Sequence, residues 1–281
     1  MEMYLSPTAN GWEINSHKSK YPDIKNTTGA ANTYLCLQHF LRSGVCKCFV
    51  GKLYYGVDKN RGSLFLMVKL VAFDFDGTIA DSVEFCLAVF DIVFKKHLGD
   101  SAPDREAIYR HFGMNEPGVL RSFIGDDFTE AEQDFYRLHR ELHARMCPEI
   151  FPGCRELFDL LKSRNIKIAL LTGRSEETCR ISLDFLGLSD LFCSIQTGSP
   201  EKNDKSAQLS ALARNNMLEN DELIYIGDAE SDVEACRKAG VKCLSAAWAA
   251  SARTEALEKI NPQLVFKSVG GMTDYIKSYI L

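Results

Sequence analysis

The sequence predicts an α/β fold built on a buried parallel sheet. Short apolar runs recur from residue 67 onward, and stretches with apolar residues at three- and four-residue spacing lie between them. The first three runs end abruptly in Asp, Thr or Gly rather than fading into a helix. Strands that alternate with helices of this length are typical of βαβ units around a sheet that is covered on both faces.

The elements of the predicted core follow in order. Apolar runs predict four strands and a weaker fifth, at residues 67–73, 166–171, 223–226, 241–244 and 264–266. Helical periodicity occupies residues 153–164, 175–187, 206–218 and 230–239. Each helix therefore lies between two strands, or directly before one, as the alternation requires.

One long segment interrupts this alternation. Roughly 90 residues without a strand signal separate the first two strands, and helical patterns fill residues 83–97, 104–112, 116–124 and 129–146. Pro148 and Pro152-Gly153 then end the helical stretch. We therefore expect a core made of residues 67–82 and 148–281, with an all-helical domain at 83–147 inserted into it.

Composition limits the class of protein. The 281 residues suggest about two domains, and 46% hydrophobic with 25% charged residues is ordinary for a globular protein. A net charge of −5 offers no electrostatic reason to bind nucleic acid, and no apolar stretch is long enough to span a membrane. The ten cysteines form no C-x-x-C pair, which favours reduced thiols and a cytoplasmic location.

The polar residues of interest follow predicted strands directly. Asp74 and Asp76 follow the first strand, Thr172 the second and Asp228 the third, while Asp232 lies about one helical turn further. The carboxyl ends of parallel strands form the edge where ligands bind. Carboxylates that converge there repel one another unless a cation holds them. Oxygen ligands without His or Cys favour a hard ion, which predicts Mg²⁺.

These residues carry a family resemblance. Four segments look like the ordered motifs of a known family: Asp74-Phe75-Asp76-Gly77-Thr78, Leu171-Thr172-Gly173-Arg174, a downstream Lys and Gly227-Asp228-Ala229-Glu230-Ser231-Asp232. With these motifs the chain resembles the haloacid dehalogenase-like hydrolases, in particular the phosphoglycolate phosphatase-like branch. The resemblance covers residues 67–281. The resemblance implies a Rossmann-like core with a helical cap after strand 1. It also implies a Mg²⁺-dependent phosphatase acting on a small phosphorylated metabolite.

The resemblance assigns a role to each matching residue. Asp74 would be the nucleophile that forms an aspartyl phosphate, and Asp76 would be the general acid and base. Thr172 and the backbone at Gly173 would hold the phosphoryl group. The Asp74 carboxylate, the Asp76 backbone carbonyl and Asp228 would bind Mg²⁺.

The phosphate-binding lysine has two candidates. We favour Lys205 over Lys202, because Asp204 is a plausible N-cap that would fix the direction of Lys205 at a helix start. Asp232 would orient this lysine or the water around the metal. In the insertion, we interpret the Gly- and Pro-rich segment 111–118 as a turn between helices, with Glu116 near a helix start. The alternative is that this segment faces the catalytic edge, where Arg121 could contact a substrate anion.

Other functions of the same fold stay open. A phosphomutase of this fold has the same catalytic and metal-binding residues, so the sequence does not distinguish a phosphomutase from a phosphatase. A non-catalytic regulatory module is a weaker alternative because Asp74, Asp76 and Asp228 are all present.

The first 66 residues differ from the rest, with a net charge of +4 against −9 for the remainder. They are either an appended module or not part of the physiological product, and we favour the second because Met67 begins a complete first strand.

Overall fold

The computed structural model describes residues 3–8, 11–16, 45–50, 53–58, 64–66, 68–201 and 204–279. The chain divides into two compact units, Met1–Val68 with Ser278–Leu281 and Lys69–Lys277. In the first unit, β1 (Met3–Thr8) and β2 (Gly11–Ser16) form an antiparallel hairpin. A separate antiparallel sheet contains β3 (Val45–Val50), β4 (Leu53–Asp58) and β5 (Leu64–Leu66).

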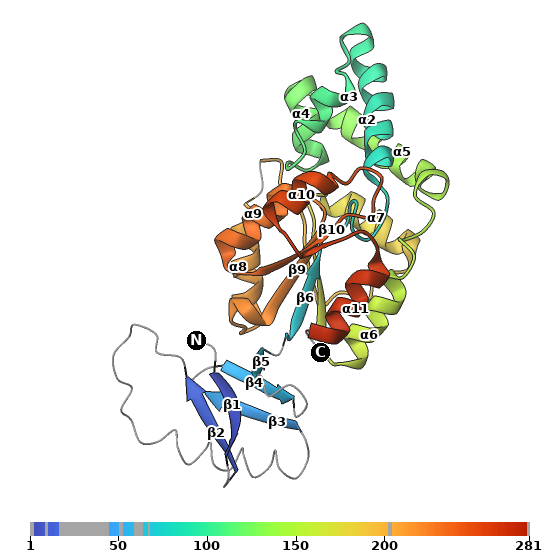
Figure 1. The fold of residues 1–281 in the computed structure, drawn as a ribbon. Coiled ribbons are helices and arrows are strands. Elements are labelled where there is room, and N and C mark those ends of the chain that lie inside the picture. Colours follow the sequence, from blue (N-terminus) through green and yellow to red (C-terminus); the bar gives the residue numbers. More distant parts are fainter. Residues whose placement is uncertain are drawn as a thin grey trace. The chain divides into compact units, whose positions relative to one another are not determined.

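The second unit contains a six-stranded parallel sheet (Figure 1). Its strands are β6 (Leu70–Phe73), β7 (Lys167–Leu171), β8 (Ser194–Gln196), β9 (Leu223–Gly227), β10 (Lys242–Ala246) and β11 (Val265–Phe266). The order is β11-β10-β9-β6-β7-β8, and every pair is parallel. The α/β fold class is therefore confirmed, with β6 between β9 and β7.

Helices cover both faces of the sheet (Figure 1). On one face, alternate residues such as Leu70 and Ala72 belong to a buried cluster with α8 (Lys205–Asn215), α9 (Glu230–Ala239) and α10 (Thr254–Ile260). On the other face, Phe73 packs edge-on against Phe158 of α6 (Cys154–Ser163), with ring centroids 5.3 Å apart. The helices α7 (Glu176–Leu186) and α11 (Val269–Tyr279) complete the core.

The inserted helices form their own apolar core. They are α2 (Val83–Leu98), α3 (Arg105–Tyr109), α4 (Glu116–Ile124) and α5 (Thr129–Met146). Phe90 packs against Phe94 of the same helix and against Phe135 of α5, with centroids 5.6 and 4.5 Å apart. Figure 1 shows this group at the carboxyl-terminal edge of the sheet. Within the described residues, no helix is both long and apolar enough to cross a membrane.

Candidate active site

Three neighbouring strands bring the predicted residues together. Asp74 follows β6, Thr172 follows β7 and Asp228 follows β9, and these strands are adjacent in the sheet. A cavity of about 570 Å³ opens at this edge, and its lining includes Asp74, Asp76, Gly173, Lys205 and Asp228. Thr172 is buried beside it, where its Oγ1 accepts a hydrogen bond from the backbone N–H of Arg174 at 3.3 Å.

The Asp74 carboxylate is held from two sides. Its Oδ1 accepts a hydrogen bond from the backbone N–H of Phe75 at 2.7 Å, and its Oδ2 contacts Nζ of Lys205 at 2.6 Å. Burial raises the pKa of Asp74 to about 6, with a further contribution from Asp232, although the charge of Lys205 opposes this rise. At neutral pH the group is therefore mainly an oriented carboxylate in a site that would readily accept another cation.

Lys205 connects two carboxylates. Its Nζ donates to Oδ1 of Asp232 at 2.6 Å, in addition to Asp74, and to the Tyr225 hydroxyl at 3.1 Å. Burial alone would lower the pKa of Lys205, but Asp232 and Asp74 raise it well above its usual value. The side chain of Asp204 accepts from the backbone N–H groups of Ser206 and Ala207, which confirms Asp204 as the N-cap of α8.

Lys202, the alternative lysine, lies outside the described residues. The structure places Lys205, the favoured candidate, beside Asp74.

A cluster of acidic groups fits a hard cation. Oxygens of Asp74, Asp228 and Asp232 all lie within 4.8 Å of one another. Burial, Asp74 and Asp232 together raise the pKa of Asp228 well above its usual range, because three negative charges meet there. Asp232 is engaged by Lys205 and by the backbone N–H of Ala229, so Asp74 and Asp228 are the carboxylates best placed to bind a metal ion. The carboxylate of Asp76 is not part of this cluster.

Gly77 leaves the space that Asp228 occupies. Its φ is +69°, in the region that favours glycine. A Cβ at this position would lie 2.2 Å from Oδ2 of Asp228, which no ordinary contact allows. The turn after β6 therefore needs glycine both for its conformation and for the approach of the Asp228 carboxylate.

If the acidic cluster binds Mg²⁺ through Asp228, the Gly77→Ala variant should bind this ion about tenfold more weakly or worse, because the added Cβ displaces the Asp228 carboxylate. Titration calorimetry of the purified variant measures this. Gly99→Ala is the matched control, since Gly99 also has a positive φ but has no atom within 4 Å of its added Cβ. Equal Mg²⁺ affinity in the two variants would contradict the assignment of Asp228 as a ligand.

Asp76 is paired with a buried arginine. Arg174 Nε lies 3.1 and 3.0 Å from the two Asp76 oxygens, and Nη2 lies 2.6 Å from Oδ1. Ser82 Oγ donates to the same Oδ1 at 2.6 Å. Burial acts to raise the pKa of Asp76, but the charge and hydrogen bonds of Arg174 outweigh it, so the pKa lies below its usual value.

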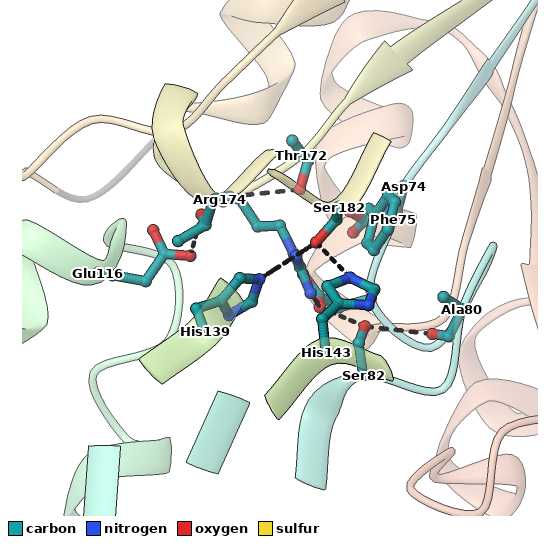
Figure 2. Close-up of polar contacts among 12 residues, drawn as sticks. Asp74, Phe75, Ala80, Ser82, Glu116, His139, His143, Thr172, Arg174 and Ser182 are labelled. Atoms are coloured by element: carbon teal, nitrogen blue, oxygen red, sulfur yellow. Dashed lines mark hydrogen bonds and ion pairs between the residues drawn. The ribbon is translucent and has the colours of Figure 1, made fainter. Parts of the chain in front are cut away.

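Arg174 also reaches the inserted helices (Figure 2). Its Nη1 donates to Ser182 Oγ at 2.6 Å, and His139 and His143 of α5 lie 3.2 and 3.0 Å from that same hydroxyl oxygen. Burial lowers the pKa of His139 well below its usual value and, with the charge of Arg174, lowers that of His143 to about 4. Both imidazoles are therefore neutral at physiological pH, so they add no charge beside the guanidinium.

The start of α4 contacts two loops of the core. Glu116 accepts hydrogen bonds from the Ser175 backbone N–H and from Thr178 Oγ1, both at 2.6 Å. The Asn115 backbone N–H donates to the Ser199 carbonyl at 2.9 Å, and the Asn115 side chain donates to the Gly198 carbonyl at 3.1 Å. Part of the segment 111–118 lines the cavity, which was the less favoured of the two interpretations of the sequence.

Arg121 lies elsewhere. It is exposed, it is not among the residues that line the cavity, and its Nε lies 3.4 Å from Oδ1 of Asp126. The structure therefore does not bring this candidate to the predicted substrate position.

Comparison with known proteins identifies the family of this chain. The family model of the haloacid dehalogenase-like hydrolases matches residues 71–246. A phosphoglycolate phosphatase from Chromobacterium violaceum is 29% identical over 224 residues, which cover 75% of this chain and 97% of the relative. A phosphoglycolate phosphatase from Aquifex aeolicus is 25% identical over 213 residues, covering 75% of this chain and 96% of that protein.

A similar fold has been solved. The crystal structure of CbbY from Rhodobacter sphaeroides in complex with phosphate has a TM-score of 0.62 and 17% sequence identity. The match covers 73% of this chain and 96% of CbbY.

Proposed function

Because the chain belongs to the haloacid dehalogenase-like hydrolases, we propose that it is a Mg²⁺-dependent phosphatase that hydrolyses a small phosphomonoester through an aspartyl phosphate. The observation that carries this proposal is the position of Asp74, whose carboxylate lies at the sheet edge, contacts Lys205 at 2.6 Å and has an oxygen within 4.8 Å of oxygens of Asp228 and Asp232. The names of the phosphoglycolate phosphatases at 25–29% identity support the same activity.

Asp74 is the nucleophile in this proposal. One of its oxygens attacks phosphorus, the bond to the leaving alcohol oxygen breaks, and the phosphoryl group remains on the carboxylate. The contacts with Phe75 N–H and Lys205 hold both carboxylate oxygens in place before the reaction begins.

Asp76 is the proton carrier. Its lowered pKa means that it is a carboxylate in the substrate-free enzyme, which is the form that takes a proton from the attacking water in the second step. To protonate the leaving alcohol in the first step it must carry a proton. The negative charge of a bound phosphate opposes that of Arg174 and so raises the pKa of Asp76 in the complex.

The remaining residues stabilise charge. Lys205, the Thr172 hydroxyl and the Gly173 backbone would bind the phosphoryl oxygens, and Asp232 would hold Lys205 in position. Asp74, Asp228 and the Asp76 carbonyl would hold Mg²⁺, which when bound neutralises negative charge between nucleophile and phosphate. The inserted helices act as a cap over this site.

The test is phosphate release from a panel of phosphomonoesters by the purified full-length protein. We expect hydrolysis with Mg²⁺ and about a tenfold or larger loss with EDTA, restored by added Mg²⁺. Absence of release from every ester in Mg²⁺, with the protein folded by circular dichroism, would refute the proposal.

A further inference from the structure

We infer, on the basis of the proposed phosphatase function, that the preferred substrates are phosphomonoesters of neutral, apolar alcohols rather than of alcohols that carry a carboxylate. The core side of the cavity holds the residues that would handle the phosphoryl group. The inserted helices supply the opposite wall, which contacts the alcohol and so selects it.

That wall is almost entirely apolar. The inserted helices contribute to the cavity lining Val83, Cys86, Phe90, Phe112, Met114 and Val119. Tyr109 extends the wall, is 47% exposed, and packs against Phe112 with ring centroids 5.0 Å apart. A partly exposed aromatic pair beside a cavity offers a favourable surface to an apolar ligand, because covering the rings removes apolar area from water.

The charged groups of the inserted helices do not provide a partner for a carboxylate. Among the described lining residues of the insertion, only Glu116 is charged, and its carboxylate is already hydrogen-bonded to Ser175 and Thr178. The arginines of this region point to acidic partners away from the lining: Arg105 to Asp91 and Glu84, Arg110 to Glu106, and Arg121 to Asp126.

Acids outnumber cations on the core side of the rim. Lys238 and Arg253 line the cavity there, but so do Asp204, Glu230 and Glu234. Arg253 Nη1 lies 2.8 Å from Oε2 of Glu230, so that guanidinium is paired. A carboxylate on the substrate alcohol would therefore lose water against an apolar wall and face a rim in which acids outnumber cations, which is unfavourable.

The cavity volume is consistent with a larger alcohol. About 570 Å³ is within the range of pockets that enclose small organic ligands. A phosphate bound at Asp74 would leave most of this space to the alcohol.

The decisive experiment compares two esters of matched leaving-group chemistry. Benzyl phosphate and 4-carboxybenzyl phosphate differ mainly in one remote carboxylate, so their intrinsic reactivities are similar. With Mg²⁺ we expect kcat/KM to be about tenfold or more higher for benzyl phosphate, chiefly through KM, because the apolar wall discriminates in binding. Propyl phosphate should likewise be preferred over 2-phosphoglycolate.

Variants locate the effect on the wall. Met114→Lys should reduce or reverse the preference for benzyl phosphate over 4-carboxybenzyl phosphate, because it adds a cation to the wall. Phe112→Ala should raise KM for benzyl phosphate more than for methyl phosphate. Arg110→Ala is the matched control in the same region, since Arg110 is exposed and its ion pair is the local one with Glu106. The ratio of kcat/KM for benzyl phosphate to that for 4-carboxybenzyl phosphate should equal the wild-type ratio.

The outcomes separate the two proposals. If the wild type hydrolyses both benzyl esters but prefers the carboxylated one, or shows no preference, the inference about the alcohol is wrong while the phosphatase proposal stands. If Met114→Lys leaves the ratio unchanged, the wall does not select the substrate. If no ester is hydrolysed at all, the failure belongs to the proposed function.

Discussion

Replacing Asp74 by asparagine should reduce phosphate release by about four orders of magnitude or more, because the amide cannot attack phosphorus. The fold should persist. Burial and Asp232 already raise the pKa of Asp74 to about 6, so a neutral side chain relieves repulsion with its acidic neighbours and leaves Lys205 paired with Asp232. We expect a Tm equal to or slightly above that of the wild type.

Asp81→Asn is the matched control for this variant. Asp81 lies in the same turn region but is exposed and does not line the cavity, so both activity and Tm should be unchanged. A mock purification from the same host measures the activity of contaminating phosphatases. Phosphate release by the Asp74→Asn protein well above that background would show that Asp74 is not the nucleophile.

Replacing Arg174 by methionine should reduce both stability and activity. The free energy of unfolding should fall by about 3 kcal/mol. This value is at the low end of the range for breaking a buried ion pair, because the Asp76 side chain is partly exposed to the cavity. Because Arg174 orients Asp76, kcat/KM should fall by about a hundredfold or more. Urea unfolding and steady-state kinetics measure the two effects.

The pH dependence has a defined sign. Arg174 holds the pKa of Asp76 below its usual value, so its removal raises that pKa and moves the corresponding limb of the kcat/KM profile to higher pH. The ion pair between Asp76 and Arg174 contributes its full stability above about pH 4, which is the pKa of aspartate in the unfolded chain. This stability is lost as the pH falls through the lower pKa that Asp76 has in the folded protein. The stability difference between wild type and Arg174→Met should therefore shrink in acid.

Two further variants test the interpretation. Arg140 also joins α5 to α7, through Glu177 at 2.8 Å, but this pair is exposed, so Arg140→Met should change stability by only about 0.5 kcal/mol. Combining Arg174→Met with Asp76→Asn removes the unpaired charge, and should recover part of the stability but none of the activity. Full activity in Arg174→Met would mean that Ser82 alone positions Asp76.

The residues after the strands were predictable from sequence because strand ends are local signals. An apolar run followed at once by Asp or Thr identifies both the strand and its edge, and the structure places Asp74, Thr172 and Asp228 on adjacent strands. Three of the four inserted helices were predicted with nearly the observed bounds, whereas α3 ends at Tyr109, three residues before its predicted end. The short strand β8 was missed, because three residues at a half-exposed sheet edge give no pattern.

Long-range partners could not be predicted in the same way. Arg174 belongs to a motif recognised in the sequence, but no feature of the sequence around it indicates that it pairs with Asp76, 98 positions earlier. The same holds for Glu116, which the sequence suggested only as a residue near a helix start and which accepts hydrogen bonds from Ser175 and Thr178. A buried charge is recognised only once its partners are placed, whereas its neighbours in sequence are known from the beginning.

The contacts at the start of α4 have a mechanical consequence. Glu116 bonds to the loop that follows Thr172 and Gly173, and Asn115 bonds to the loop that precedes Lys205. A movement of α4 away from the core breaks both sets of bonds at once and leaves the buried Glu116 carboxylate without its donors. The position of this one helix end is therefore coupled to two loops at once, the one that contains Gly173 and the one that precedes Lys205.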